Sequence, residues 1–132
     1  MDFRVRSTNY GATNRGWLRG PHGAEPGANP SVVLDLTKFT NTTVSGVIPS
    51  GTVVGRVTTG GLVGEYDPAA SDGRQTAIGL LFNPEPINTG QTKGANALVQ
   101  SGNIDPARLP FQTGKGSLDA AAKTALPNLI TA

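Results

Sequence analysis

Residues 52–66 read TVVGRVTTGGLVGEY, two short apolar segments that a Gly60-Gly61 pair separates. Both segments are rich in valine or other strand-forming residues. A Gly-Gly pair between two such segments is typical of a tight β-hairpin, because glycine adopts the positive φ angles of hairpin turns without strain. We therefore predict an antiparallel hairpin in this part of the chain.

The sequence on either side of the hairpin predicts further short strands between turn-forming residues. These strands are expected at residues 31–36, 42–48, 76–82, 95–101 and 128–131. The clearest of them is 76–82, where strict alternation would place Ile78, Leu80 and Phe82 on one face. The eighteen glycines and ten prolines of the 132-residue chain fit short strands joined by many turns.

Residues 117–126 are predicted as the only helix. Ser117 can cap its first turn, while Asp119 in that turn and Lys123 in the last turn both match the helix dipole. Pro127 cannot continue the helix and ends it. The fold class that follows is mainly β with one short helix.

Residues 1–30 differ from the rest, and we expect them to form a flexible arm in front of a β-rich domain at 31–132. The arm contains many Gly and Pro residues and shows neither helical nor strand periodicity. Few apolar side chains are present to offset the entropy of ordering it. It is also basic, and its arginines are Arg4, Arg6, Arg15 and Arg19.

The composition argues against catalysis. The chain has no Cys and one His, His22, which falls in the expected arm. A single His in such a segment supplies neither a Ser-His-Asp triad nor a multi-histidine metal site. Glu65, Asp67 and Asp72 lie around a turn and do not match a calcium loop, so we interpret them as solvated turn residues.

The segment Gly114-Lys115-Gly116-Ser117 superficially resembles a phosphate-binding loop. Leu109 stands where that loop requires its first Gly, and Gly116 follows the Lys where Ser or Thr is required. A Gly-rich approach to a helix cap explains these residues instead. We therefore predict no enzyme activity and no cofactor.

The basic arm raises the question of nucleic-acid binding. No recognition helix, RNA-binding aromatic motif or zinc module accompanies it, and Gly, Asn and Thr separate its arginines. Arginines together with aromatic side chains suit a protein surface equally well. No apolar run approaches the length of a membrane span. We expect neither a nucleic-acid nor a membrane partner.

Four motifs follow one another in a particular order, and a further set lies downstream. The four are SGTVVG (50–55), LVGEYD (62–67), SDG (71–73) and AIGLL (77–81). Downstream come Ser101-Gly102, then Arg108, Leu109 and Pro110, a short helix and a closing apolar strand. In this order and spacing, residues 47–131 resemble the phage head decoration family typified by protein D of phage lambda.

The resemblance implies a small β-clip-like domain and a structural role. Family members form trimers at local threefold positions on the outer surface of the virion, where they bind the major capsid protein and stabilise the shell. Their N-terminal arm orders against the capsid and adds to its β-structure. The arm of this chain is not recognisably similar to theirs and is longer.

The resemblance leads us to expect that this arm binds the capsid. The candidate contact residues are Arg4, Val5, Arg6, Arg15, Trp17, Arg19, Val32, Val33 and Leu34. The arginines would face an acidic capsid surface. For Trp17 the alternative is that it folds back onto its own domain.

Two other functions remain open from the sequence. One is a glycan- or receptor-binding β module of a virion surface or tail protein, in which Trp17, Tyr66 and Phe82 would be stacking platforms. The other is an enzyme such as a nucleotide hydrolase of β-clip architecture. The enzyme would need clustered acids and a phosphate-binding motif, and the sequence has neither.

Overall fold

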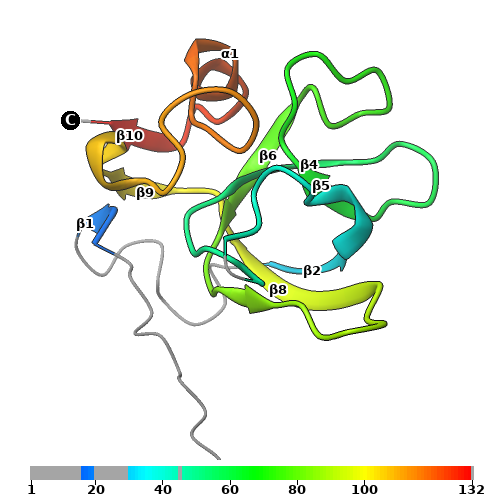
Figure 1. The fold of residues 1–132 in the computed structure, drawn as a ribbon. Helices are drawn as coiled ribbons and strands as arrows, with labels where there is room; N and C mark the ends of the chain where they lie inside the picture. The colour runs from blue at the N-terminus through cyan, green and yellow to red at the C-terminus, as the bar shows by residue number, and fades with distance from the viewer. Residues whose placement is uncertain (1–15, 20–29, 45, 132) are drawn as a thin grey trace, which may run out of the picture.

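The structure is a computed structural model that describes residues 16–19, 30–44 and 46–131. A closed barrel lies at its centre (Figure 1). The strands of the barrel follow one another around it in the order β2-β5-β4-β6-β8. They are β2 (Ser31–Asp35), β4 (Val53–Arg56), β5 (Val63–Glu65), β6 (Ala77–Leu81) and β8 (Lys93–Val99). All neighbours are antiparallel except β2 and β5, which pair in parallel through Leu34 and Val63.

A smaller lobe lies beside the barrel and contains both described ends of the chain (Figure 1). Its sheet has the order β1-β9-β10, in which β9 lies between the other two strands. The lobe consists of β1 (Leu18–Arg19), β9 (Gly102–Ile104), the 3₁₀ helix η2 (Pro106–Arg108), α1 (Ala120–Ala125) and β10 (Leu129–Thr131). The remaining elements are the 3₁₀ helix η1 (Leu36–Lys38), β3 (Val47–Ile48) and β7 (Glu85–Pro86).

The predicted hairpin is confirmed. Strands β4 and β5 pair antiparallel, with Val54 opposite Glu65 and Arg56 opposite Val63. Gly60 and Gly61 make the connection with φ angles of 90° and 72°, in the left-handed region that side chains disfavour. The turn chemistry of the sequence was therefore sufficient to place these two strands.

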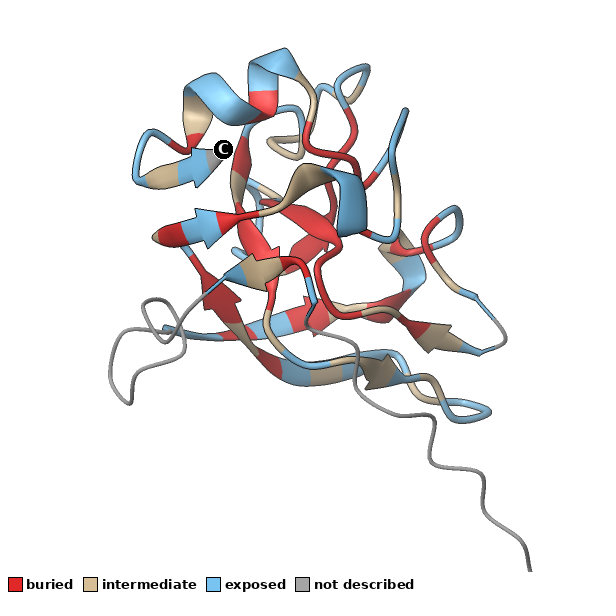
Figure 2. Cartoon of the chain, turned by 90° about the vertical axis from the view of Figure 1, so that its left-hand side faces the viewer, coloured by how far each residue is buried: buried red, intermediate tan, exposed pale blue. Residues whose placement is uncertain are grey.

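Two hydrophobic clusters share the strands β4, β6 and β8. Leu34, Val54, Val63, Leu81 and Leu98 belong to the cluster inside the barrel. The second cluster lies between the barrel and the lobe. Its members are Trp17, Val53, Tyr66, Ala77, Leu80, Val99, Ile104, Leu109, Leu118, Ala122 and Leu126. Figure 2 shows buried segments gathered in the middle of the molecule. Most of β4 and β6 and the end of β8 at Leu98–Val99 are buried on both faces, which explains why the sequence carries adjacent apolar pairs there instead of strict alternation.

A β-bulge in β6 changes the predicted faces of that strand. Val54 lies opposite Gly79 and the next residue, Gly55, opposite Ala77, so Ile78 has no partner on β4. An extra residue reverses the alternation beyond it. As a result Ile78 packs against the barrel interior while Leu80 packs in the second cluster, and the prediction that they share a face was wrong.

The predicted strand 42–48 is reduced to β3 and an isolated bridge between Val44 and Val47.

The helix starts later than predicted. Helix α1 spans Ala120–Ala125, and its N-cap is Asp119, whose carboxylate accepts the Ala122 N–H. The predicted cap, Ser117, lies two residues before Asp119, is buried and donates instead to the Gly114 carbonyl.

The mainly β class with one short α-helix is confirmed. Within the described residues, strands take 35% and helices 12%. The β-clip-like architecture that the resemblance implies stays a prediction, and what the structure shows is a closed barrel with a lobe at its side.

Candidate functional site

The candidate contact residues fall into three groups in the structure. Arg4, Val5, Arg6 and Arg15 lie outside the described residues, as does His22. Trp17 and Arg19 lie in or beside β1. Val32, Val33 and Leu34 lie in β2. The structure does not bring the second and third groups together, because β1 belongs to the lobe and β2 to the barrel.

Trp17 is a core residue. Its side chain is 1% exposed and packs in the cluster between the barrel and the lobe. The indole lies against Gly51, where an added Cβ would come within 2.7 Å of Nε1. The Trp17 carbonyl accepts a 2.7 Å hydrogen bond from the Asp105 N–H. The alternative interpretation, in which Trp17 folds back onto its own domain, is therefore what the structure shows, and the expectation of an accessible anchor is corrected.

The indole N–H of Trp17 is buried and has no hydrogen-bond partner among the described residues. An unsatisfied buried donor costs stability. Burial of the Trp17 ring stabilises the fold, and the unsatisfied N–H subtracts from that stabilisation.

Arg19 forms an ion pair beside β1. Its guanidinium lies 3.1 Å from Oδ2 of Asp105, and Nε of Arg108 lies 3.4 Å from the same oxygen. The other carboxylate oxygen accepts the Ala107 N–H and caps η2. The hydrogen bond from Arg19, followed by the other two contacts, holds the pKa of Asp105 below its usual range.

The three β2 residues differ in what they offer to a partner. Val32 and Leu34 point into the barrel and are buried. Val33 points outward, opposite Ala95 of β8, and is 49% exposed. Of these three candidates, only Val33 presents its side chain to a partner surface.

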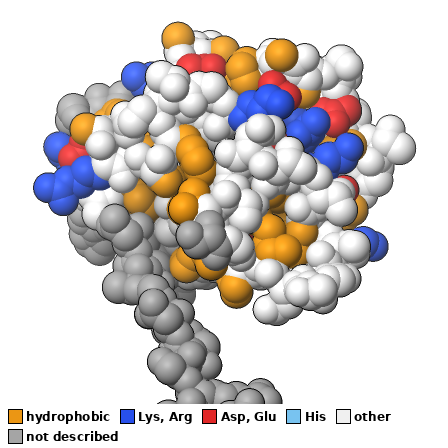
Figure 3. All heavy atoms as spheres, viewed as in Figure 1, with side chains coloured by type: hydrophobic (Ala, Val, Ile, Leu, Met, Phe, Trp, Pro, Cys, Tyr) orange, Lys and Arg blue, Asp and Glu red, His pale blue; other side chains and the backbone are white. Residues whose placement is uncertain are grey.

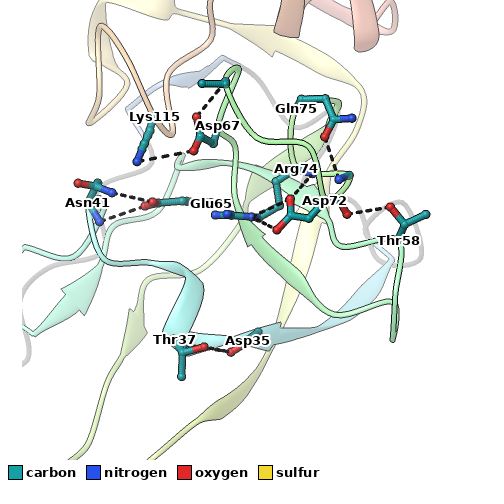
Figure 4. Close-up of polar contacts among 12 residues, drawn as sticks. Asp35, Thr37, Asn41, Thr58, Glu65, Asp67, Asp72, Arg74, Gln75 and Lys115 are labelled. Carbon is teal, nitrogen blue, oxygen red and sulfur yellow. Dashed lines mark hydrogen bonds and ion pairs between the residues drawn. The ribbon is translucent and has the colours of Figure 1, made fainter.

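Glu65 is not the solvated turn residue that the sequence suggested. Its side chain is buried, and it accepts hydrogen bonds from the N–H and Nδ2 of Asn41 at 3.2 and 3.0 Å (Figure 4). It accepts a third from the Thr42 hydroxyl at 2.9 Å. Because these donors satisfy the buried carboxyl oxygens, Glu65 holds the segment after η1 against the barrel. This is a structural role.

Asp67 and Asp72 also have partners of their own. Asp67 lies 3.6 Å from Nζ of Lys115 and accepts the Ala69 N–H. Asp72 pairs with Nε of Arg74 at 3.0 Å (Figure 4). Burial alone would raise the pKa of Asp72, but the hydrogen bonds from Arg74 outweigh it and lower the pKa. Asp67 and Asp72 thus each pair with a different base, and their described contacts are structural.

The glycine-rich loop before α1 uses its backbone for packing. The Gly116 N–H donates to the Tyr66 carbonyl, and the Gly116 carbonyl accepts from the Val53 N–H. Backbone donors that are satisfied internally cannot cradle a phosphate. The sequence departs from the phosphate-loop pattern at Gly116, and in the structure the backbone of this residue binds Tyr66 and Val53.

Tyr66 lies beneath this loop and fixes the helix. It is fully buried, and its hydroxyl donates to the carboxylate of Asp119 at 2.9 Å. Burial, together with this hydrogen bond and the nearby negative charges, raises the pKa of Tyr66 to about 12. Since Trp17 is buried as well, two of the three stacking platforms of the glycan-binding alternative are inaccessible.

Other kinds of site find little support in the described part of the chain. There, no group of three or more His, Cys, Asp or Glu side chains could hold a metal ion. Nor does any helix within the described ranges have the length and apolar character needed to cross a membrane. A shallow pocket between β6 and the end of α1 has no ionisable residue in its lining.

Sequence reasoning missed Asp105 and Arg108 as a charged site. The signal was present as Asp105-Pro106-Ala107-Arg108, because Asp before Pro is a helix-cap pattern that places the fourth residue back over the first. The partnership with Arg19 could not be seen, since it depends on the pairing of β1 with β9.

Comparison with known proteins agrees with the motif order. The sequence model of the bacteriophage lambda head decoration protein D family matches residues 36–129, well over half of the chain. No curated protein and no solved structure gives a significant match. The match covers the barrel from η1 onward together with β9 and α1, and by it the chain belongs to the bacteriophage lambda head decoration protein D family.

Proposed function

We propose that the protein binds as a homotrimer to the major capsid protein, at local threefold positions on the outer surface of a tailed-phage head, and stabilises the shell. The observation that carries this proposal is the family match over residues 36–129. The family supports a capsid decoration role and a structural rather than an enzymatic protein. The trimer and its position on the shell are our extension of that role.

The mechanism requires no catalysis. Each trimer would present three N-terminal segments, and binding at one of them raises the effective concentration of the other two. An extended segment that adds to an exposed sheet edge gains main-chain hydrogen bonds with little sequence demand. Arg4, Val5, Arg6 and Arg15 are proposed as contacts in this segment, and Arg19 and Val33 as contacts on the domain.

The burial of Trp17 determines where a truncation should end. Deleting residues 2–15 removes the proposed contacts Arg4, Val5, Arg6 and Arg15 and leaves Trp17 in place, whereas deleting residues 2–30 also removes this core side chain. We expect the shorter deletion to stay folded and to bind heads more weakly. The longer deletion should lose stability as well.

The test is cosedimentation of the purified chain with undecorated heads, with the solution mass measured by light scattering. Wild type should sediment with heads and have the mass of a trimer. The 2–15 deletion should keep its circular dichroism spectrum and remain mostly in the supernatant. If the 2–15 deletion binds heads with wild-type affinity, the deleted residues do not contribute to capsid binding and this part of the proposal fails.

A further inference from the structure

A pair of arginines on the lobe shares a single carboxylate. Arg19 reaches Asp105 from β1, and Arg108 reaches the same Oδ2 atom from η2. We call Arg19 and Arg108 the arginine pair. In Figure 3 blue side chains flank a red one at the left edge of the molecule, the side on which Figure 1 draws β1 and β9.

Asp105 positions the arginine pair. Asp105 is fixed by its backbone bond to the Trp17 carbonyl and by the cap that its side chain forms with the Ala107 N–H. The two guanidinium groups converge on this fixed carboxylate. A site that is oriented before binding loses less entropy when a ligand arrives.

The arginine pair has more positive charge and more hydrogen-bond donors than Asp105 can neutralise or bind. One carboxylate neutralises one of two guanidinium groups, and the side chains of Arg19 and Arg108 are 50% and 69% exposed. A guanidinium carries five N–H donors, of which the contacts to Asp105 use few. At least half of each arginine side chain is therefore open to a partner.

We propose that the arginine pair binds an acidic side chain of the capsid protein, whose carboxylate would bridge Arg19 and Arg108. This inference rests on the proposed function and names the chemistry of one contact. Planar guanidinium groups match carboxylates in a two-bond geometry that Lys does not reproduce. The contact would add to that of the preceding N-terminal segment, because Arg19 lies at the end of that segment that is docked on the domain.

A nucleic-acid phosphate has similar chemistry but fits the charge density less well. Nucleic-acid binding takes much of its affinity from phosphate contacts, and proteins with a steep salt dependence make about six to ten of them. The site offers two arginines with an acid between them. We therefore favour the carboxylate and treat DNA binding as an outcome of the test.

The test compares full-length Arg108→Gln and Arg19→Gln with Lys93→Gln, a control that removes the same charge from the exposed end of β8. Affinity for DNA-free, undecorated heads is measured by cosedimentation at low and at high salt. Each arginine variant should bind roughly fivefold more weakly at low salt, and the difference should shrink at high salt because exposed ion pairs are modest and screened. Lys93→Gln should bind as wild type does.

Fluorescence of Trp17, the only tryptophan in the chain, reports whether β1 is still docked in each variant. An unchanged emission maximum with weaker head binding supports the inference. If wild type binds heads and Arg108→Gln binds equally well, the inference fails and the proposed function stands. If wild type does not bind heads, both fail. Binding of wild type to duplex DNA that is lost in Arg108→Gln would assign the pair to phosphates and overturn the proposal.

Discussion

Substitution of Trp17 by Ala should destabilise the folded domain by about 3 kcal/mol. The side chain is 1% exposed, so almost its whole surface is removed from water on folding. A tryptophan buries about 200 Å², which at about 25 cal/mol per Å² contributes about 5 kcal/mol. The unpartnered indole N–H offsets this by about 1–3 kcal/mol, leaving about 3 kcal/mol as the net loss.

The assay is urea unfolding followed by far-ultraviolet circular dichroism, because Trp17→Ala removes the fluorescent residue. Protein concentration must be kept constant, since self-association would raise the apparent stability. Trp17→Phe should lose less than Trp17→Ala, because it keeps most of the ring packing and removes the unsatisfied donor. Val33→Ala is the matched control on the exposed face of β2 and should stay within about 0.5 kcal/mol of wild type.

A loss below about 1 kcal/mol for Trp17→Ala, equal to that of Val33→Ala, would refute this reasoning, because buried large-to-small substitutions cost more. It would mean that Trp17 lies on the surface in solution. The residue would then again be available as an anchor for the capsid.

Three further predictions concern the loop and helix that cover the barrel. Gly114 and Gly116 share a φ of 75°, but an added Cβ meets nothing at the first and comes within 2.5 Å of Thr42 at the second. Gly116→Ala should therefore lose about 1–3 kcal/mol more than Gly114→Ala in urea unfolding, and equal losses would show that Thr42 moves away freely. Tyr66 should ionise with a pKa of about 12 when absorbance at 295 nm is followed. Its raised folded-state pKa keeps its contribution to stability intact below pH 10 and removes it as the pH rises toward 12, so wild type should lose stability relative to Tyr66→Phe over this interval; parallel curves would contradict the burial of the hydroxyl. In thermal unfolding, Asp119→Ala should lower the free energy of unfolding by about 2 kcal/mol, because it removes a helix cap and leaves the Tyr66 hydroxyl without its acceptor. Asp119→Asn keeps an acceptor oxygen and should lose much less.

The elements that the sequence predicted correctly are those with local signals. The β4–β5 hairpin follows from Gly60-Gly61, and the end of α1 follows from Pro127. Strands β1 and β9 were missed, because each is short and the pairing of Leu18 with Ile104 joins distant parts of the chain. The bulge at Ile78 was invisible for a similar reason, since a register shift depends on the partner strand.

The candidate site was predictable in its residue types and not in its partnerships. The sequence indicated that Arg19 is basic, but not that Asp105 and Arg108 would meet it. It also placed Glu65 near a turn, but did not indicate that Asn41 and Thr42 would supply its buried hydrogen bonds. Such compensation depends on tertiary packing, which spacing along the chain does not encode.

The position of Trp17 has a consequence for the order of events during synthesis. Trp17 is synthesised before its partners Ile104 and Leu118, which follow it in the chain by about 90 and 100 residues. Until then the indole has no completed pocket. On a nascent chain β1 should therefore stay undocked until the segments that carry Ile104 and Leu118 have also left the ribosome.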